Sequence, residues 1–243
     1  MNMRRGAEFE SPVSGLKQIL EEWHKIFPYK YEIVGENPKA IILGEEHNID
    51  EIVSSQASLI TAVKPEIVLY EPLHAWQYNP QTKVLELIPG RKIERDADYW
   101  FEGGYSSAPK PLLKDAPDQL KQAASDNNSW IIGCDLTYAE VNEIERHIAQ
   151  TNPDKYRFEG RLIKKSNPKE IINYYSPEIN PFRDKLMAEM ILKYQKQSSR
   201  PLIAILGWKH AARIKKTTVL EQAGLEYAVV RQDKKPSDIK KQL

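Results

Sequence analysis

The chain has 243 residues, of which 41% are hydrophobic and 28% are charged. This balance is typical of a globular protein that buries a sizeable core, and it excludes a disordered chain. Lysine and arginine total 35 against 34 for aspartate and glutamate, so no overall field gathers nucleic acid or an anionic membrane, and we expect neither as a partner.

Two further observations narrow the setting. No apolar run approaches the roughly 20 residues of a membrane span, and the first residues lack the apolar middle of a signal peptide, so we expect a cytoplasmic protein. The single cysteine, Cys134, lies in the apolar run "WIIGCDL". It excludes an internal disulfide and a cysteine-rich zinc cluster, and the run favours a buried, inert thiol over a nucleophile.

The amino-terminal part predicts a helix followed by two strands. Residues 11–27 place apolar side chains on one side of a helix for which Ser11 or Ser14 would be the cap, namely Leu16, Ile19, Leu20, Trp23 and Ile26. Residues 31–34 and 39–44 are β-rich runs separated by the turn-like "GENP". We expect these two runs to be neighbouring strands.

The next segment predicts a strand–helix–strand unit. Residues 48–64 have apolar positions at mostly helical spacing, with Asn48 and Asp50 as candidate caps. Residues 64–72, "KPEIVLYEP", predict a buried strand that ends in Glu71. Such a unit implies a parallel sheet that carries its site at the carboxyl ends of the strands. His47 and Glu71 should therefore lie on the same edge.

Residues 73–115 lose this regularity and read as an insertion. A long irregular stretch in a compact domain is either a functional lid or a loosely ordered loop. Aromatic residues recur along it: Trp76, Tyr78, Tyr99, Trp100 and Phe101. His74, three residues after Glu71, could enter a site from this lid.

Regular patterns return in the second half. We predict a helix over residues 115–127, a strand over 129–136 that ends in Asp135, and a helix over 137–150. Residues 151–180 are polar and rich in proline, and we expect a second insertion made of short helices and connectors.

The carboxyl-terminal part predicts another helix–strand–helix–strand series, over residues 181–196, 200–207, 208–224 and 225–231. Arg183 and Asp184 occupy the first turn of the first of these helices, where Asp184 is expected to act as a cap. The fold class is thus a single α/β domain, residues 1–243, with a mostly parallel central sheet flanked by helices and a charged tail over residues 232–243.

One short phrase occurs twice, as "ILGEEH" from Ile42 to His47 and "ILGWKH" from Ile205 to His210. In both copies a predicted strand ends just before a predicted helix. Gly44 and Gly207 would let the backbone turn tightly or approach a ligand, and unpaired N–H groups there could hold an anion or a developing oxyanion.

The imidazoles suggest a shared site. If the two strands lie close together, His47, His210 and Glu71 form a set suited to a divalent metal ion. Glu45 and Glu46 either act in that site or stabilise a helix dipole. Asp135 and Arg183 either form an ion pair that locks the fold or belong to the same site.

In their order and spacing, "ILGEEH", "KPEIVLYE", "IIGCDL", "RDKLMAEMI" and "AILGWKH" resemble the TraB and TIKI proteins, whose relatives include erythromycin esterase and the ChaN haem-binding lipoproteins. The resemblance spans Ala40 to about Val230. It implies the erythromycin esterase/ChaN/TIKI-like fold and a metal-dependent protease site that includes Gly44, His47, Glu71, Gly207 and His210, with Arg183 and Asp184 at the start of the late helix. "GEEH" is closer to the ChaN pattern, which would make Glu45 a site residue.

Two classes of function follow. In the first, the chain is a metal-dependent hydrolase of an amide or ester bond in a peptide or small-molecule substrate. His47, His210 and Glu71 would surround Mn²⁺, Co²⁺ or Zn²⁺, Glu45 or Glu46 would move a proton, and Arg183 would stabilise negative charge. A metal-free hydrolase with one histidine as the base is a variant of this class.

In the second class, the chain binds haem, a metal or an anionic ligand without turnover, as the ChaN-like "GEEH" and the aromatic lid suggest. The sequence leaves open whether the chain forms a homodimer.

Overall fold

The computed structural model describes residues 13–46, 49–93, 116–167, 170–172, 176–232 and 234. The strands of its main sheet are β1 Lys30–Val34, β2 Ala40–Glu45, β3 Ile67–Tyr70, β4 Trp76–Asn79, β5 Val84–Leu87, β6 Trp130–Gly133, β9 Leu202–Gly207 and β10 Tyr227–Gln232. The helices are α1 Val13–Ile26, α2 Asp50–Val63, α4 Asp118–Asp126, α5 Tyr138–Thr151, α6 Asn180–Gln197, α7 Trp208–Ile214 and α8 Val219–Gln222.

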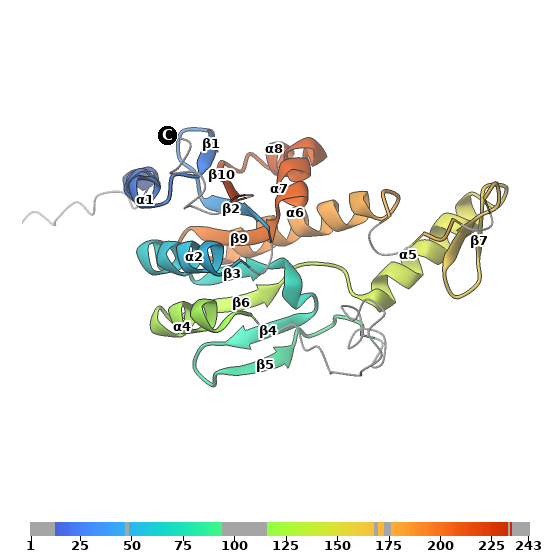
Figure 1. The fold of residues 1–243 in the computed structure, drawn as a ribbon, viewed down its shortest axis with the longest axis horizontal. Coiled ribbons are helices and arrows are strands. Elements are labelled where there is room, and N and C mark those ends of the chain that lie inside the picture. Colours follow the sequence, from blue (N-terminus) through green and yellow to red (C-terminus); the bar gives the residue numbers. More distant parts are fainter. Residues whose placement is uncertain are drawn as a thin grey trace, which may run out of the picture.

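The eight strands form one mixed sheet in the order β1-β10-β2-β9-β3-β6-β4-β5 (Figure 1). The five central strands, β10 to β6, are parallel to one another. At the edges, β1 pairs antiparallel with β10, and β4 pairs antiparallel with both β6 and β5. The prediction of an α/β protein with a large, mostly parallel sheet is confirmed, and all the parallel strands end at one edge.

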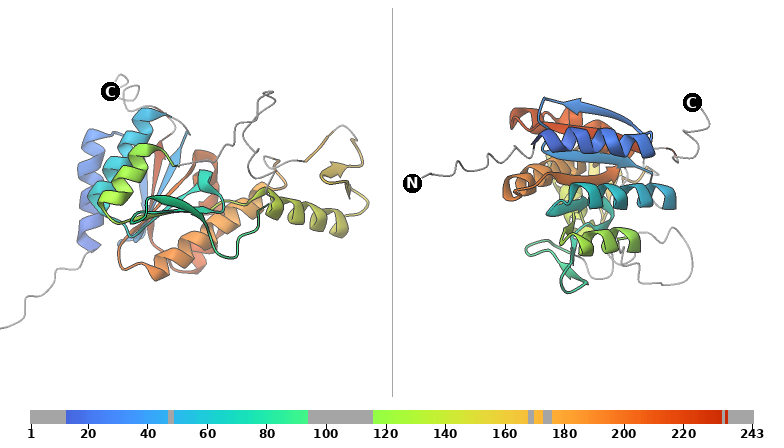
Figure 2. Two further views of the ribbon diagram at one scale, coloured as in Figure 1. Left: turned by 90° about the horizontal axis from the view of Figure 1, so that it is seen from below. Right: turned by 90° about the vertical axis from the view of Figure 1, so that its left-hand side faces the viewer.

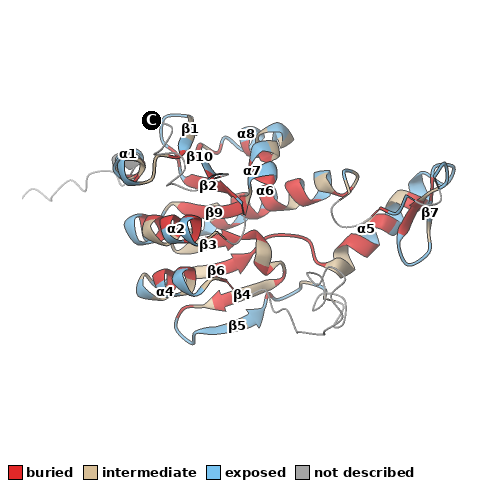
Figure 3. Cartoon of the chain, in the orientation of Figure 1, coloured by how far each residue is buried: buried red, intermediate tan, exposed pale blue. Residues whose placement is uncertain are grey.

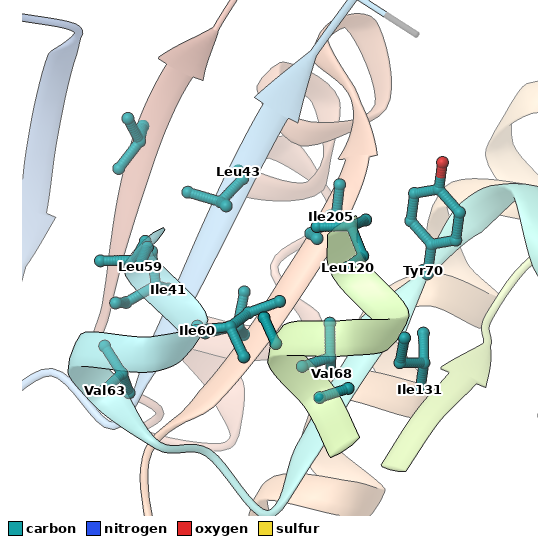
Figure 4. Packing of buried hydrophobic residues seen from close by; sticks show 14 of the residues in the cluster. Ile41, Leu43, Leu59, Ile60, Val63, Val68, Tyr70, Leu120, Ile131 and Ile205 are labelled. Carbon is teal, nitrogen blue, oxygen red and sulfur yellow. The ribbon is translucent and has the colours of Figure 1, made fainter. Parts of the chain in front are cut away.

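Helices cover both faces of the sheet (Figure 2). On one face α1, α2 and α4 pack on alternate strand residues such as Ile41 and Leu43 of β2 and Val68 of β3 (Figure 4). On the other face α6, α7 and α8 pack on the intervening residues, among them Ile42 and Leu69. Burying a large apolar side chain of this kind contributes about 1.5–3 kcal/mol. The central strands read as continuous apolar runs because both of their faces are covered.

A smaller unit lies beyond the carboxyl edge of the sheet. It consists of α5 and the two-stranded sheet of β7 Tyr156–Phe158 and β8 Leu162–Lys164, drawn at the right of Figure 1. Thr137 and Glu140 form a capping box at the start of α5. This unit has its own buried cluster, which includes Leu136, Val141 and Leu162; Figure 3 colours the buried residues.

Several predictions about the amino-terminal elements are corrected. The strands β1 and β2 are not neighbours, because β10 lies between them. Ile26 is 58% exposed, although its spacing placed it on the packed face of α1. The cap position of α2 is Ile49, without a side-chain cap, so Asp50 is not the cap, and Asn48 lies outside the described residues.

The two predicted insertions also differ from expectation. Within residues 73–115, β4 and β5 form a hairpin that extends the main sheet, so this part is not an irregular lid. Residues 151–180 contain the β7–β8 hairpin in place of short helices. The single helix predicted over 208–224 is divided into α7, a 3₁₀ turn and α8, with Thr218 at a positive φ of 57°.

The described part of the chain also bears on the Cys134 thiol and on membrane-spanning helices. Cys134 is fully buried, and burial raises the pKa of its thiol well above the usual value, so the interpretation as an inert thiol holds. Among the described helices, none has the length and apolar character needed to cross a membrane.

Candidate functional site

A pocket of about 380 Å³ opens at the carboxyl edge of the central strands. Because β9 lies between β2 and β3, the ends of these three strands meet there, and Glu45 of β2 is directly paired with Gly207 of β9. The lining residues are Glu45, Glu46, Glu71, Asn180, Arg183, Gly207, Trp208, Lys209, His210 and Arg213. The structure therefore brings together six of the predicted site residues: Glu45, Glu46, Glu71, Arg183, Gly207 and His210.

Arg183 joins two buried carboxylates at the base of this pocket. Its Nε and Nη2 contact both oxygens of Asp135 at 2.5–3.2 Å, and its Nη2 also donates to Oε1 of Glu71 at 2.9 Å. All three side chains are at most 8% exposed. Burial alone would raise the pKa of Asp135, but the charge and hydrogen bonds of Arg183 outweigh it and hold that pKa well below its usual range.

The other oxygen of Glu71 has a backbone partner. The N–H of Gly207 donates to its Oε2 at 2.5 Å. The carboxylate is thus fixed on one side by the end of β9 and on the other side by Arg183. A carboxylate held by charge-assisted hydrogen bonds keeps a defined orientation toward the pocket.

The second half of the site is a pair formed by Asp184 and His210. Nδ1 of His210 lies 2.5 Å from Oδ1 of Asp184, and Arg213 contacts the same carboxylate through Nε at 2.6 Å and Nη2 at 3.3 Å. Burial would raise the pKa of Asp184, but its hydrogen bonds with His210 and Arg213 lower it overall. The expectation that Asp184 caps α6 is wrong, since Ile179 occupies the cap position and Asp184 binds across to α7.

His210 reaches toward Glu71 with its other nitrogen. Nε2 of His210 is 3.6 Å from Oε1 of Glu71. This distance is too long for a direct hydrogen bond, but a water molecule or a cation can contact both atoms at once. In the described structure, three buried carboxylates (Glu71, Asp135 and Asp184) face two guanidiniums (Arg183 and Arg213). A proton on the imidazole or a bound cation would offset the remaining negative charge.

The two glycines have different roles from those expected. Gly44 lies inside β2, and a Cβ there would come within 2.9 Å of the Ala211 Cβ and 3.1 Å of the Trp208 Cα. Its function is to let α7 pack closely on the strand, not to form a turn. Gly207 does stand at the strand-to-helix turn, but its N–H is bound to Glu71 and is not available to an oxyanion.

The acidic pair after Gly44 divides into one buried and one exposed residue. Glu45 is 2% exposed, and Nε2 of Gln56 donates to its carboxylate at 2.5 Å. Glu46 is exposed at the pocket. Neither residue is in the first turn of α2, so the helix-dipole interpretation does not apply. His47 lies outside the described residues, so its predicted meeting with His210 stays a prediction.

His74 does not line the pocket. Its Nδ1 is 2.9 Å from the carbonyl oxygen of Leu136, and its backbone has a positive φ of 50°. Arg91 holds this region by donating to the carbonyl oxygens of His74 and Asp135 and to the carboxylate of Glu140. The histidine therefore supports the strand ends behind Asp135, and the expectation that it enters the site is wrong.

Sequence reasoning missed Asn180, Trp208, Lys209 and Arg213 as lining residues. Arg213 could have been found, because it follows His210 by three residues and so shares its side of a helix. Trp208 and Lys209 are the two variable positions of the repeated glycine–histidine phrase.

Within the described ranges, no group of three or more histidine, cysteine, aspartate or glutamate side chains has the arrangement of a metal site. His47, the third ligand expected from the sequence, lies outside these ranges. Comparisons of the chain with protein-family models, with curated proteins and with solved structures gave no match.

Proposed function

We propose that this pocket is the active site of a hydrolase that cleaves an amide or ester bond. The observation that carries the proposal is the buried Asp184–His210 pair, whose imidazole faces Glu71 in the pocket. Nδ1 lies 2.5 Å from Oδ1 of Asp184 and 3.0 Å from Nη2 of Arg213. In the tautomer whose Nδ1–H donates to Asp184, Nε2 presents a lone pair to the pocket. An imidazole oriented in this way can serve as a general base or as a metal ligand.

The His210–Glu71 pair is suited to position a nucleophilic water. Nε2 and Oε1 are 3.6 Å apart, so a water bound on their pocket side can lie within hydrogen-bond distance of both, where it would donate one proton to the base and be oriented by the carboxylate. General-base assistance of this kind contributes about 10²–10⁴-fold to a reaction rate. Gly207 and Arg183 hold Glu71 in position for this role.

Arg213 is better suited than Arg183 to stabilise negative charge on the reacting carbonyl. The Arg183 guanidinium is 5% exposed and is engaged by two carboxylates. The Arg213 side chain is 33% exposed at the pocket, and its Nη1 has no partner among the described residues. A cation at that position can meet a developing oxyanion.

The metal-dependent form of the proposal assigns His210, Glu71 and His47 as ligands. Asp184 supports it, since metal-bound histidines usually donate their second nitrogen to a carboxylate, and so does the excess of buried negative charge. A divalent ion such as Mn²⁺, Co²⁺ or Zn²⁺ would supply a bound water of lowered pKa. This form corresponds to the TIKI-like resemblance of the sequence.

A metal-free hydrolase of the erythromycin-esterase type is favoured by a different observation. Oε1 of Glu71 already accepts from Arg183 at 2.9 Å, and Oε2 accepts from Gly207. A guanidinium so close to the carboxylate takes part of the charge that a metal ligand would offer. In this form His210 acts on water directly.

Metal content measured by mass spectrometry separates the two forms. Protein purified without an affinity tag should be compared as wild type, His47→Ala and His210→Ala, with and without incubation in Mn²⁺, Co²⁺ or Zn²⁺. A near-stoichiometric metal that is lost in both variants supports the metal-dependent form. Hydrolysis of a peptide and ester panel that persists in metal-free protein supports the other form, and hydrolysis unchanged in both variants contradicts both.

The haem-binding alternative rested on the ChaN-like "GEEH" and on aromatic residues of the expected lid. Trp76 and Tyr78 belong to β4, and neither lines the pocket. Tyr99, Trp100 and Phe101 lie outside the described residues. Titration with haem tests this alternative, because the absence of a Soret shift would remove it.

A further inference from the structure

A second pocket, of about 300 Å³, lies beside the first one on the face of the sheet that α7 covers. We call it the α7 pocket. Its lining residues come from β1, β10, β2 and α7: Lys30, Tyr31, Glu32, Gly44, Trp208, Ala211, Ala212, Lys215, Val229, Val230 and Arg231. None of these residues has a role in the proposed hydrolysis, and among them only Trp208 also lines the first pocket.

The register of the strands explains the hollow. Lys30, Arg231 and Gly44 are paired across three adjacent strands, and Glu32, two residues further along β1, is paired with Val229. Since side chains alternate along a strand, these residues face the same side. α7 packs directly on Gly44 of β2 through Ala211 and Trp208, and the pocket lies beside this contact, between α7 and the neighbouring strands β10 and β1.

The surfaces of the α7 pocket are apolar in the middle and basic at the rim. Gly44, Val229, Ala211 and Ala212 provide the apolar part. At the rim, Lys215 is paired with Glu32, whereas Lys30 is exposed and has no ion-pair partner among the described residues. The guanidinium of Arg231 lies 5.1 Å from the centre of the Trp208 ring.

Trp208 connects the α7 pocket with the candidate active site, because it lines both. It is 36% exposed, which is unusual for a residue with so much apolar surface. An indole that separates two pockets can contact a planar or aliphatic group in either of them.

We propose that the α7 pocket binds a small apolar molecule that carries a carboxylate. The apolar body would pack on Val229, Ala212 and the indole of Trp208, and the carboxylate would be held by Lys30 at the rim. The volume is at the lower end of small-molecule sites, so one aromatic ring system or a short aliphatic chain fits. We further infer that this apolar, carboxylate-bearing group is the part of the substrate beyond the scissile bond, an inference that rests on the proposed function.

Binding of 1-naphthylacetate, an aromatic carboxylate, tests this inference by isothermal titration calorimetry without any need for turnover. The variants are Lys30→Glu, which reverses the charge at the rim, and Ala212→Phe, which fills the pocket from an exposed helix position. Lys25→Glu is the matched control, because Lys25 is an exposed lysine of α1, a helix on the opposite face of the sheet. The neutral 1-naphthylacetamide tests the need for the charge.

We expect saturable binding of naphthylacetate that is at least about fivefold weaker in both pocket variants and unchanged in Lys25→Glu. The acetamide should bind more weakly than the acetate. Absence of binding to the wild type, or binding by Lys30→Glu and Ala212→Phe that equals binding by the wild type, would overturn the assignment.

The same titration on His210→Ala keeps the two proposals apart. Binding should be retained there, because His210 does not line the α7 pocket. A wild-type protein that binds naphthylacetate but hydrolyses nothing would refute the hydrolase alone. A protein that hydrolyses esters but fails to bind the probe would refute the α7 pocket alone.

Discussion

Replacing Arg183 by methionine should destabilise the protein strongly. The substitution keeps most of the side-chain volume but removes the cation that pairs with both Asp135, which is fully buried, and Glu71, which is 6% exposed. Removing one partner of a buried ion pair costs about 3–5 kcal/mol, because it leaves an uncompensated buried charge. For a chain of this size, that corresponds to a fall of roughly 10 °C in Tm.

The pH dependence of this effect distinguishes a lost ion pair from lost packing. Arg183 lowers the pKa of Asp135 in the folded state, so the pair contributes stability above the ordinary value of 3.8 and loses it as the pH falls toward the folded pKa. The difference in unfolding free energy between wild type and Arg183→Met should therefore shrink as the pH falls below 3.8.

Urea unfolding at pH 7 and at several acidic pH values measures both effects. Arg157→Met is the control, because Arg157 forms a surface ion pair with Glu159 in which both side chains are about half exposed. We expect that control to change stability by less than about 1 kcal/mol. A loss below about 1 kcal/mol for Arg183→Met at pH 7, or a loss independent of pH, would refute the reasoning.

Three other predictions concern different parts of the fold. Gly44→Ala should cost about 1–3 kcal/mol in urea unfolding because its Cβ meets Ala211 and Trp208, whereas Gly15→Ala, with open space in α1, should be neutral or stabilising; equal effects would contradict the close-packing role. Burial raises the pKa of Glu145 from 4.5 to about 7 in the folded state, so charging it destabilises the fold as the pH rises through this range. Glu145→Gln should remove a loss of about 3 kcal/mol between pH 4.5 and 8, measured by urea unfolding, and parallel pH profiles of variant and wild type would exclude this effect. The buried Cys134 thiol should react with a thiol reagent only after the protein unfolds, and rapid reaction of the native protein would show that it is accessible.

The central strands could be predicted because burial on both faces imposes continuous apolar runs, as in "AIILG" and "LIAILG". Their spatial order could not, since β10 inserts between β1 and β2 through pairings that join distant parts of the chain. The β4–β5 hairpin was missed because its strands have only four residues each and β5 is largely exposed. Short strands with one solvated face carry little apolar signal.

The candidate site was partly predictable for the same reason. Glu71 and His210 follow strong strand signals, and parallel neighbours bring their ends together. Asp184 was misassigned because an acidic residue in a first helical turn looks locally like a cap. Its true partners, His210 and Arg213, are 26 and 29 residues away, and no local pattern reports such a contact.

The most direct test of the proposed site is hydrolysis of a peptide and ester panel by wild type, His210→Ala, and Lys185→Ala as the control, since Lys185 is an exposed residue of α6 that does not line the pocket. We predict that any activity above background falls at least about 100-fold in His210→Ala, as expected for loss of a general base or metal ligand, and persists in Lys185→Ala. Activity that is equal in wild type and His210→Ala would contradict the assignment of the Asp184–His210 pair as the catalytic centre.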